Sequence, residues 1–221
     1  MPILGPIPIG DDNPTELRPW VNHALIALNV AIFVAYGFRD DYGVVVAEYG
    51  LVPALPSLLD AFAAMFLHAG AGHLIGNMLF LWIYGDNVED ALGHVGYALF
   101  YLAGGLMAAL IHGLATADKL APMIGASGAI SAVLGAYLLI YPKTKITFAG
   151  LLFFVKPFKF QLWAFVALGG WFVFQLLDQM DSDLTANVAY AAHIGGFIAG
   201  FAVMGLLVMG GRVEPHWDSA R

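Results

Sequence analysis

The sequence contains no cysteine and has few charged side chains. Its 221 residues include nine Lys and Arg and 16 Asp and Glu, so 11% of the chain is charged. An ordinary soluble domain carries about a quarter charged residues. The lack of cysteine excludes disulfide bonds and thiol catalysis. The basic residues form no run or patch, and the formal net charge is −7, which argues against nucleic acid as a partner.

Hydrophobic residues are abundant instead. They make up 60% of the chain, and the mean hydropathy is +0.78, which is typical of a protein that resides in a lipid bilayer. Since a spanning helix needs about 20 apolar residues, the length allows roughly six spans and no sizeable soluble domain. We therefore expect a cytoplasmic tail over residues 1–20, a membrane domain over residues 21–209 and a second cytoplasmic tail over residues 210–221.

Six apolar segments are predicted to form spanning helices, which makes the expected fold class an all-α, polytopic six-helix bundle. The segments cover residues 21–37, 70–90, 93–114, 125–141, 161–177 and 188–209. Residues 38–67 carry charges and prolines, so we expect a loop there with short helices lying in the membrane interface. The Lys-rich stretch before the fifth segment is predicted to be a loop.

The basic residues set the predicted orientation, because they gather in short cytoplasmic loops. With the N-terminus inside, the inner side holds Arg18, Lys143, Lys145, Lys156, Lys159, Arg212 and Arg221, and the outer side holds Arg39 and Lys119. We therefore expect both termini in the cytoplasm. The second, fourth and sixth spans then begin at the external side. Glu89, near the inner turn after the second span, is predicted to be a local hydrogen-bonding anchor.

Four polar side chains lie at a similar depth in these spans. His73 and Asn77 are early in the second span, Ser127 is early in the fourth and His193 is early in the sixth. The first two are one helical turn apart and therefore share a face. Ionisable groups inside a membrane usually face the bundle interior and mark function. We expect the four side chains to converge just below the outer surface.

Small residues would let the fourth and sixth spans pack closely. The matching stripes are Gly128, Ala132 and Gly135 in the fourth span and Ala192, Gly196 and Gly200 in the sixth. Such packing would bring the His193 imidazole and the Ser127 hydroxyl into hydrogen-bonding range, the arrangement of a base and its nucleophile. No acidic residue lies at that depth, so a Ser-His dyad without a third carboxylate is predicted.

The same region offers groups that could stabilise an oxyanion. They are the side chains of His73 and Asn77 and the main-chain N–H groups at the start of the fourth span, including that of Gly128. The positive end of the helix dipole acts in the same direction. A lone serine in a membrane helix most often only bonds to a carbonyl one turn earlier. The matching depth of His193 favours the nucleophile.

Three linked motifs resemble those of the rhomboid family of intramembrane serine proteases. They are H-x-x-x-N at residues 73–77, G-x-S-G at 125–128 and A-H-x-x-G-x-x-x-G at 192–200. The resemblance covers most of the chain, with the same motif order and span placement. It implies a six-helix core, a dyad of Ser127 and His193, no cofactor or metal, and transmembrane protein substrates. With no targeting pattern among the first twenty residues, it implies a bacterial inner membrane.

Two features depart from the family. The frequent Trp-Arg pair of the first external loop is missing between residues 43 and 67, and Ser131 stands one turn after the serine, where some members have an aromatic residue. We expect Tyr190, just under one turn before His193, to support the imidazole instead. His68 matches a recurrent family histidine and is expected to be structural.

Three alternatives stay open. A catalytically inactive relative could bind membrane proteins as a quality-control factor, although the chain retains the whole polar set. A transporter is disfavoured, because the polar groups leave the inner half without a path and no inverted repeat is clear. A zinc site of His68, His73 and His193 is disfavoured too, since the chain has no H-E-x-x-H motif and no carboxylate at that depth.

Overall fold

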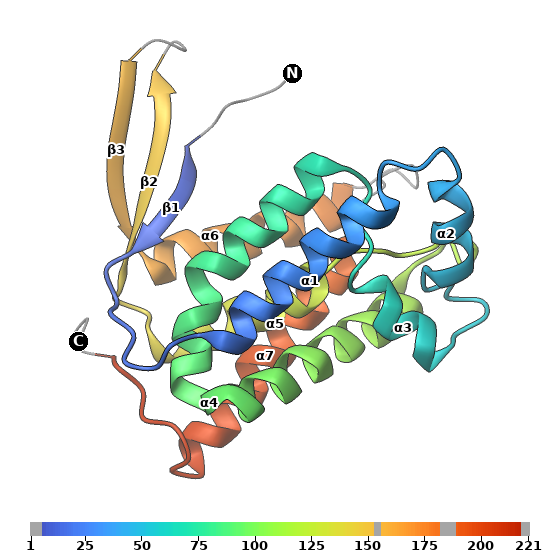
Figure 1. The fold of residues 1–221 in the computed structure, drawn as a ribbon. Helices are drawn as coiled ribbons and strands as arrows, with labels where there is room; N and C mark the ends of the chain where they lie inside the picture. The colour runs from blue at the N-terminus through green and yellow to red at the C-terminus, as the bar shows by residue number, and fades with distance from the viewer. Residues whose placement is uncertain (1–5, 153–155, 182–188, 218–221) are drawn as a thin grey trace.

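The computed structural model describes residues 6–152, 156–181 and 189–217, and the chain is mostly helical (Figure 1). The helices are α1 (Trp20–Tyr36), α2 (Tyr42–Tyr49), α3 (Leu58–Ala64), α4 (Ala71–Ala115), α5 (Ser127–Ile140), α6 (Ala164–Asp181) and α7 (Tyr190–Met209). The strands are β1 (Ile7–Asp11), β2 (Lys145–Leu152) and β3 (Lys156–Trp163). Val188, the first residue of the predicted last span, and Arg221, one of the basic residues used to predict the orientation, lie outside the described residues.

The long helix α4 folds back on itself, so it supplies both the second and the third predicted segments (Figure 1). The reversal occurs at Gly93, whose φ of +68° is one that glycine adopts without a steric penalty. Of the described helices, α4 and α7 are long and apolar enough to cross a membrane by themselves. Shorter apolar helices cover Trp20–Tyr36, Ser127–Ile140 and Ala164–Leu177.

Helix α5 is largely buried and packs closely against α7. A methyl group at Gly196 would lie 2.2 Å from the carbonyl oxygen of Gly128, and one at Gly200 would lie 2.0 Å from that of Ala132. From the α5 side, a methyl group at Gly135 would lie 2.1 Å from the Phe197 oxygen. The backbones can therefore touch only because these positions are glycines.

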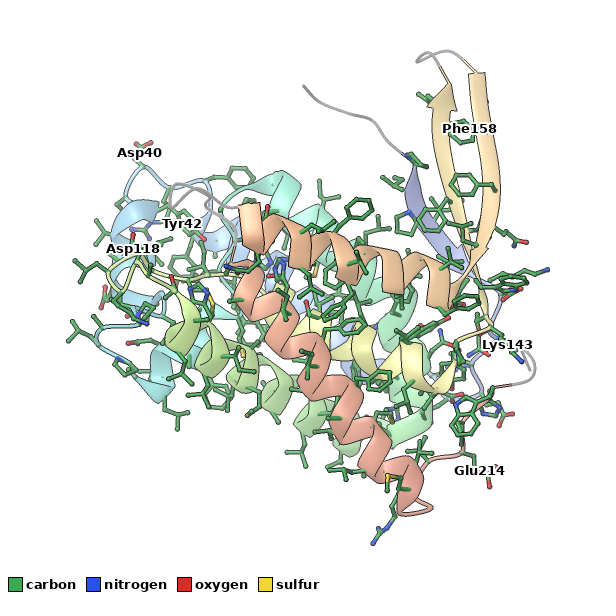
Figure 2. All side chains as sticks on the ribbon, turned by 180° about the vertical axis from the view of Figure 1, so that it is seen from behind. Asp40, Tyr42, Asp118, Lys143, Phe158 and Glu214 are labelled. Carbon is green, nitrogen blue, oxygen red and sulfur yellow. The ribbon has the colours of Figure 1, made fainter. Side chains whose placement is uncertain are left out.

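The two ends of the bundle differ in what they carry. We call the end where α5 and α7 begin the serine end and the end where they finish the hairpin end. Tyr42 and Asp118 lie at the serine end, and Lys143 and Glu214 lie at the opposite end (Figure 2). The C-terminal segment returns to the hairpin end, where the His216 N–H donates to the Ile140 oxygen at 2.8 Å.

A three-stranded antiparallel sheet in the order β1-β2-β3 shows that the all-α prediction is wrong in this respect. Lys145 pairs with Trp163 and Ile7 pairs with Ala149, and the hairpin projects away from the helices (Figure 1). The first four residues of β2, K-I-T-F, alternate between polar and apolar, as is common in strands, and the next four, A-G-L-L, do not. The predicted fifth segment began at residue 161, but β3 continues through Trp163 and α6 begins at Ala164.

The first strand lies within the predicted N-terminal tail, so part of that tail belongs to the folded unit. At its end, the Asp11 carboxylate accepts a hydrogen bond from the Tyr137 hydroxyl of α5 at 2.5 Å. The loop over residues 38–67 contains the short helices α2 and α3, which confirms the prediction that helices form there.

Glu89 forms the hydrogen-bonding anchor that the sequence predicts. Its fully buried carboxylate accepts from the backbone N–H groups of Val21, at 3.0 Å, and Asn22, at 2.7 Å. The His94 Nδ1 atom lies 2.5 Å from the same carboxylate. Since the first N–H groups of a helix have no partner within it, Glu89 caps the start of α1 from another helix.

Candidate active site

Ser127 is the first residue of α5, and the backbone before it turns sharply. Gly125 has a φ of +125°, which disfavours any residue with a side chain. Its N–H donates to the Ala64 oxygen at 2.8 Å. A methyl group at this position would lie 2.8 Å from Cε1 of His73 and 3.6 Å from the Ser127 Oγ atom. A bare backbone here therefore lets His73 approach the serine.

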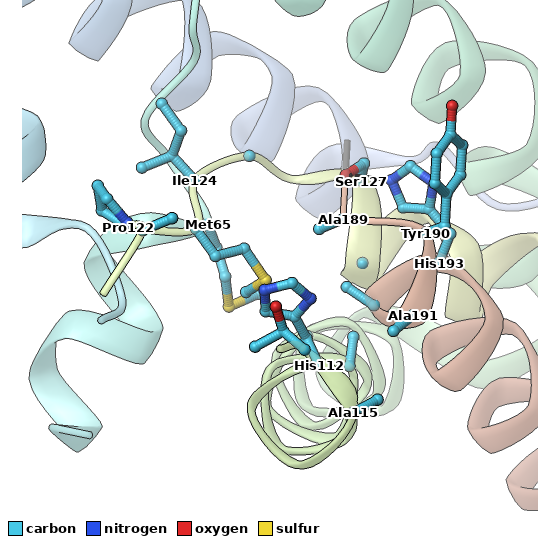
Figure 3. Close-up of a pocket in the computed structure, with 18 of the residues that line it drawn as sticks. Met65, His112, Ala115, Pro122, Ile124, Ser127, Ala189, Tyr190, Ala191 and His193 are labelled. Atoms are coloured by element: carbon cyan, nitrogen blue, oxygen red, sulfur yellow. Dashed lines mark hydrogen bonds between the residues drawn. The ribbon is translucent and has the colours of Figure 1, made fainter. Parts of the chain in front are cut away.

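The imidazole of His193 faces the Ser127 hydroxyl from the first turn of α7 (Figure 3). The Nε2 atom lies 2.8 Å from Oγ, within hydrogen-bonding range. The glycine contacts between α5 and α7 begin beside this pair, because Gly196 lies three residues after His193 and Gly128 directly follows Ser127. The structure therefore brings together the two residues that the sequence predicts as nucleophile and base.

A third side chain, which the sequence analysis missed, contacts the imidazole. The Nδ1 atom of His193 lies 2.6 Å from the Oε1 atom of Gln175 in α6. A carbonyl oxygen only accepts hydrogen bonds, so Nδ1 carries the proton and Nε2 is free to accept from Ser127. Gln175 is a polar residue inside an apolar run, W-F-V-F-Q-L-L, and such a residue in a predicted span indicates a functional position.

Two aromatic rings flank the imidazole. Tyr190 lies edge-on, with its ring centroid 6.4 Å from that of His193 and an interplanar angle of 89°. Trp171 of α6, which was not predicted, lies 6.1 Å away at 35°. The Ser131 hydroxyl donates to the Ser127 carbonyl oxygen at 2.7 Å, so this serine makes the bond to the preceding turn that is common in membrane helices.

The predicted oxyanion donors lie around the same cavity. The Asn77 Nδ2 atom is buried and has no hydrogen-bond partner among the residues that the structure describes. His73 Nδ1 accepts from the Ala69 N–H at 3.3 Å, which leaves the proton on Nε2, the nitrogen nearer Gly125. The Gly128 N–H belongs to the first turn of α5, where backbone donors lack an intrahelical acceptor.

The cavity has a volume of about 790 Å³ and is lined by both catalytic candidates and by His73 and Asn77. Its size lies within the usual range for sites that hold small ligands. The lining also includes other polar side chains, among them His112 and Asp118, beside apolar ones such as Met65 and Met123. The Ser127–His193 pair therefore faces a space that can admit another chain.

His68 lies beside this group, in the segment before α4. The Tyr42 hydroxyl donates to the His68 carbonyl oxygen at 2.9 Å and accepts from its N–H at 3.0 Å. Burial, assisted by the nearby His73, lowers the pKa of the His68 imidazole to about 4, so the ring is neutral at neutral pH. Within the described ranges, no three His, Cys, Asp or Glu side chains gather to hold a metal ion.

A family model, the Rhomboid domain, matches residues 56–210 of the chain. The chain belongs to the rhomboid family. This confirms the resemblance of the three motifs and makes the protein a mostly helical membrane protein. The matched range includes all four polar residues at the serine end and excludes β1 and α1.

Similar proteins of known name support the same assignment. This rhomboid protein is 30% identical over 189 residues to Rhomboid protein 1, mitochondrial, of Saccharomyces cerevisiae, covering 80% of this chain and 50% of the relative. It is 30% identical over 158 residues to RHOMBOID-like protein 6, mitochondrial, of Arabidopsis thaliana, covering 72% and 46%. The human Presenilin-associated rhomboid-like protein, mitochondrial, is 25% identical over 207 residues, covering 84% and 50%. The chain spans about half the length of these relatives.

These names correct one prediction. The predicted bacterial inner membrane with cytoplasmic termini is contradicted by these relatives, which are eukaryotic proteins with mitochondrial names. The sequence argument failed because neither the family resemblance nor the missing targeting pattern, on which it rested, specifies a compartment.

Proposed function

We propose that this rhomboid protein is an intramembrane serine endopeptidase that hydrolyses peptide bonds in or near the transmembrane segments of other membrane proteins. The observation that carries the proposal is the 2.8 Å contact between His193 Nε2 and Ser127 Oγ beside a cavity. A hydroxyl needs an adjacent base to act as a nucleophile at neutral pH. The Nδ1 contact with Gln175 supports the tautomer in which Nε2 is that base.

In the proposed reaction, His193 Nε2 takes the Ser127 proton while Oγ attacks the scissile carbonyl carbon. Negative charge then develops on the carbonyl oxygen, near donors from His73, Asn77 and the Gly128 N–H. Collapse of this intermediate gives an acyl-enzyme at Ser127, and His193 returns the proton to the leaving amine. Water then attacks the acyl carbon while His193 Nε2 takes its proton, and return of that proton to Ser127 Oγ releases the acid product. Apart from the substrate and water, the proposed reaction uses only side chains and backbone groups of this chain and calls on no metal or cofactor.

We also propose that the chain crosses the bilayer six times, through α1, the two arms of α4, α5, α6 and α7. Successive spans alternate in direction, so the starts of α4, α5 and α7 lie on one side of the membrane. This supports a site near one surface, within reach of water. A substrate helix would enter from the bilayer beside the first arm of α4 and α6, and its end would unwind so that a peptide carbonyl reaches Ser127.

The test is cleavage of a model single-span substrate by purified protein in detergent. We expect Ser127→Ala and His193→Ala each to lower the rate by at least about 1,000-fold while the proteins stay folded. Ser131→Ala is the matched control, since it removes a hydroxyl one turn along the same helix and should cleave normally.

Equal cleavage by Ser127→Ala would disprove the proposal. Failure of the folded wild type on several unstable helices, and with serine-reactive phosphonates, would favour a catalytically inactive binding or quality-control factor.

A further inference from the structure

We propose that Gln175 is a positioning residue that holds the His193 imidazole in the tautomer and orientation needed to accept the Ser127 proton. The proposal rests on the proposed function, in which His193 is the base. Gln175 would act through the histidine and would not touch the substrate. The catalytic group would then be a Ser-His-Gln array in which the third member is neutral and comes from α6, a helix that carries neither dyad residue.

The surroundings of His193 leave this task to Gln175. The His193 backbone N–H donates to the Ala189 oxygen at 3.2 Å, and Trp171 and Tyr190 flank the His193 ring. Gln175 Oε1 is the hydrogen-bond partner that the structure shows for Nδ1. A neutral imidazole without this acceptor could protonate on Nε2 instead. Nε2 would then donate a hydrogen bond and could not take the serine proton.

The place of Gln175 is fixed by packing between α6 and α7. The Phe172 ring stacks on the Phe197 ring with centroids 4.5 Å apart, and Trp171 lies 6.1 Å from the same ring. Gln175 follows Phe172 and Trp171 by three and four residues, so all three side chains lie on the same face of α6. The aromatic contacts therefore aim the amide at Nδ1.

The first test observes the tautomer directly and needs no activity. Protein with ¹⁵N-labelled histidine is compared by NMR with His193→Ala, which identifies the His193 signals among those of the seven histidines. We expect a protonated Nδ1 and an unprotonated Nε2 in the wild type. Gln175→Met and Gln175→Leu should lose this pattern. Gln175→Glu, which retains an acceptor oxygen of the same reach, should keep it.

The second test measures cleavage kinetics of the same proteins. We expect Gln175→Met to lower kcat about tenfold, the upper end of what one neutral hydrogen bond contributes, with KM unchanged. Gln175→Glu should recover most of the rate. Gln161→Met is the matched control. It removes an amide that donates to the Thr147 hydroxyl at 3.1 Å in the hairpin, and it should cleave normally.

The two tests separate the proposal from the function on which it rests. Wild-type ring signals and wild-type kcat in Gln175→Met and Gln175→Leu would overturn the role of Gln175 and leave the protease intact. The expected ring signals in a protein that neither cleaves nor reacts with a serine-directed phosphonate would overturn the proposed function and retain the contact. If neither Met nor Leu folds, loss of kcat in Gln175→Glu with an unprotonated Nδ1 would contradict the proposal.

Discussion

The two ends of the bundle both bury asparagine, but they use its amide differently. Near the hairpin end, Asn22 Nδ2 donates to the Leu81 oxygen at 2.9 Å, and Asn22 Oδ1 accepts from the Tyr97 hydroxyl at 2.8 Å. At the serine end, the Asn77 Nδ2 atom has no partner within the described residues and lies against the cavity. The first amide is occupied by the fold, and the second has a donor available for an incoming group.

The charged groups show the same difference. Glu89 at the hairpin end accepts hydrogen bonds from the start of α1, and Asp11 accepts from Tyr137 at 2.5 Å and from Asn87 at 3.1 Å. These contacts hold the N-terminal segments against α4 and α5. A buried polar residue is therefore not a functional residue by burial alone. Unused hydrogen-bonding capacity beside a cavity is the feature that separates the serine end.

The largest effect on activity beyond the dyad is expected at Asn77. Asn77→Ala should lower kcat about 100-fold, the loss seen when one oxyanion donor is removed, because the Nδ2 donor would act on the intermediate. The melting temperature should change little, since no described contact of Nδ2 is lost. Cleavage rates and thermal unfolding in detergent check both parts. A normal kcat in this variant would show that Asn77 does not act as an oxyanion donor.

The opposite pattern is expected at Asn22. Asn22→Ala would leave the buried Tyr97 hydroxyl and the Leu81 oxygen without their partners, so it should lower the free energy of unfolding by about 2 to 3 kcal/mol. The activity of the molecules that remain folded should equal that of wild type, because Asn22 lies away from the cavity. Active-site titration with a phosphonate gives the folded, competent fraction. A lower kcat per titrated site would break the distinction between the two ends.

A smaller effect is expected from the titration of Asp11. Burial raises the pKa of this carboxyl to about 7, although the hydrogen bond from Tyr137 acts in the opposite direction. The folded protein therefore holds the proton more tightly than the unfolded chain. The contribution of the protonated Asp11 carboxyl to stability is complete below about pH 4 and is lost as the pH rises through about 7. Because the carboxyl is partly exposed, we expect about 1 to 2 kcal/mol.

Melting temperatures in detergent between pH 4 and pH 8 measure this effect. The fall with rising pH should be weaker in Asp11→Asn than in wild type. Asp12→Asn, a change at the exposed neighbouring carboxylate, is the matched control and should retain the fall. An identical pH profile for wild type and Asp11→Asn would show that other groups control the stability in this range.

The convergence at the serine end could be predicted because it depends on depth and direction alone. His73, Ser127 and His193 each lie near the start of an apolar segment, and alternating spans place those starts at one end of the bundle. The hydrogen bond between Ser127 and His193 follows once glycines let α5 and α7 approach. Local sequence carries all of this information.

The sheet and Gln175 were missed because each depends on distant contacts. Residues 161–163 continue without a break into the apolar start of α6, so composition alone gives no boundary there. The strand β1 precedes α1 and β2 follows α5, so their pairing joins segments far apart in the sequence, which no local pattern reveals. The amide of Gln175 reaches the His193 imidazole only because α6 packs beside it, and the sequence does not show that packing.

The smallest expected effect tests whether a paired group at the serine end behaves like those at the hairpin end. Tyr42→Phe removes both hydrogen bonds to the His68 backbone, so it should lower the free energy of unfolding by about 1 kcal/mol. Tyr42 does not line the described cavity, so kcat should stay within about twofold of wild type. Tyr49→Phe, at an exposed tyrosine of the same helix, is the matched control and should change neither quantity. A large loss of kcat at unchanged stability would mean that the loop around His68 takes part in the reaction, and that pairing alone does not separate structural from catalytic groups.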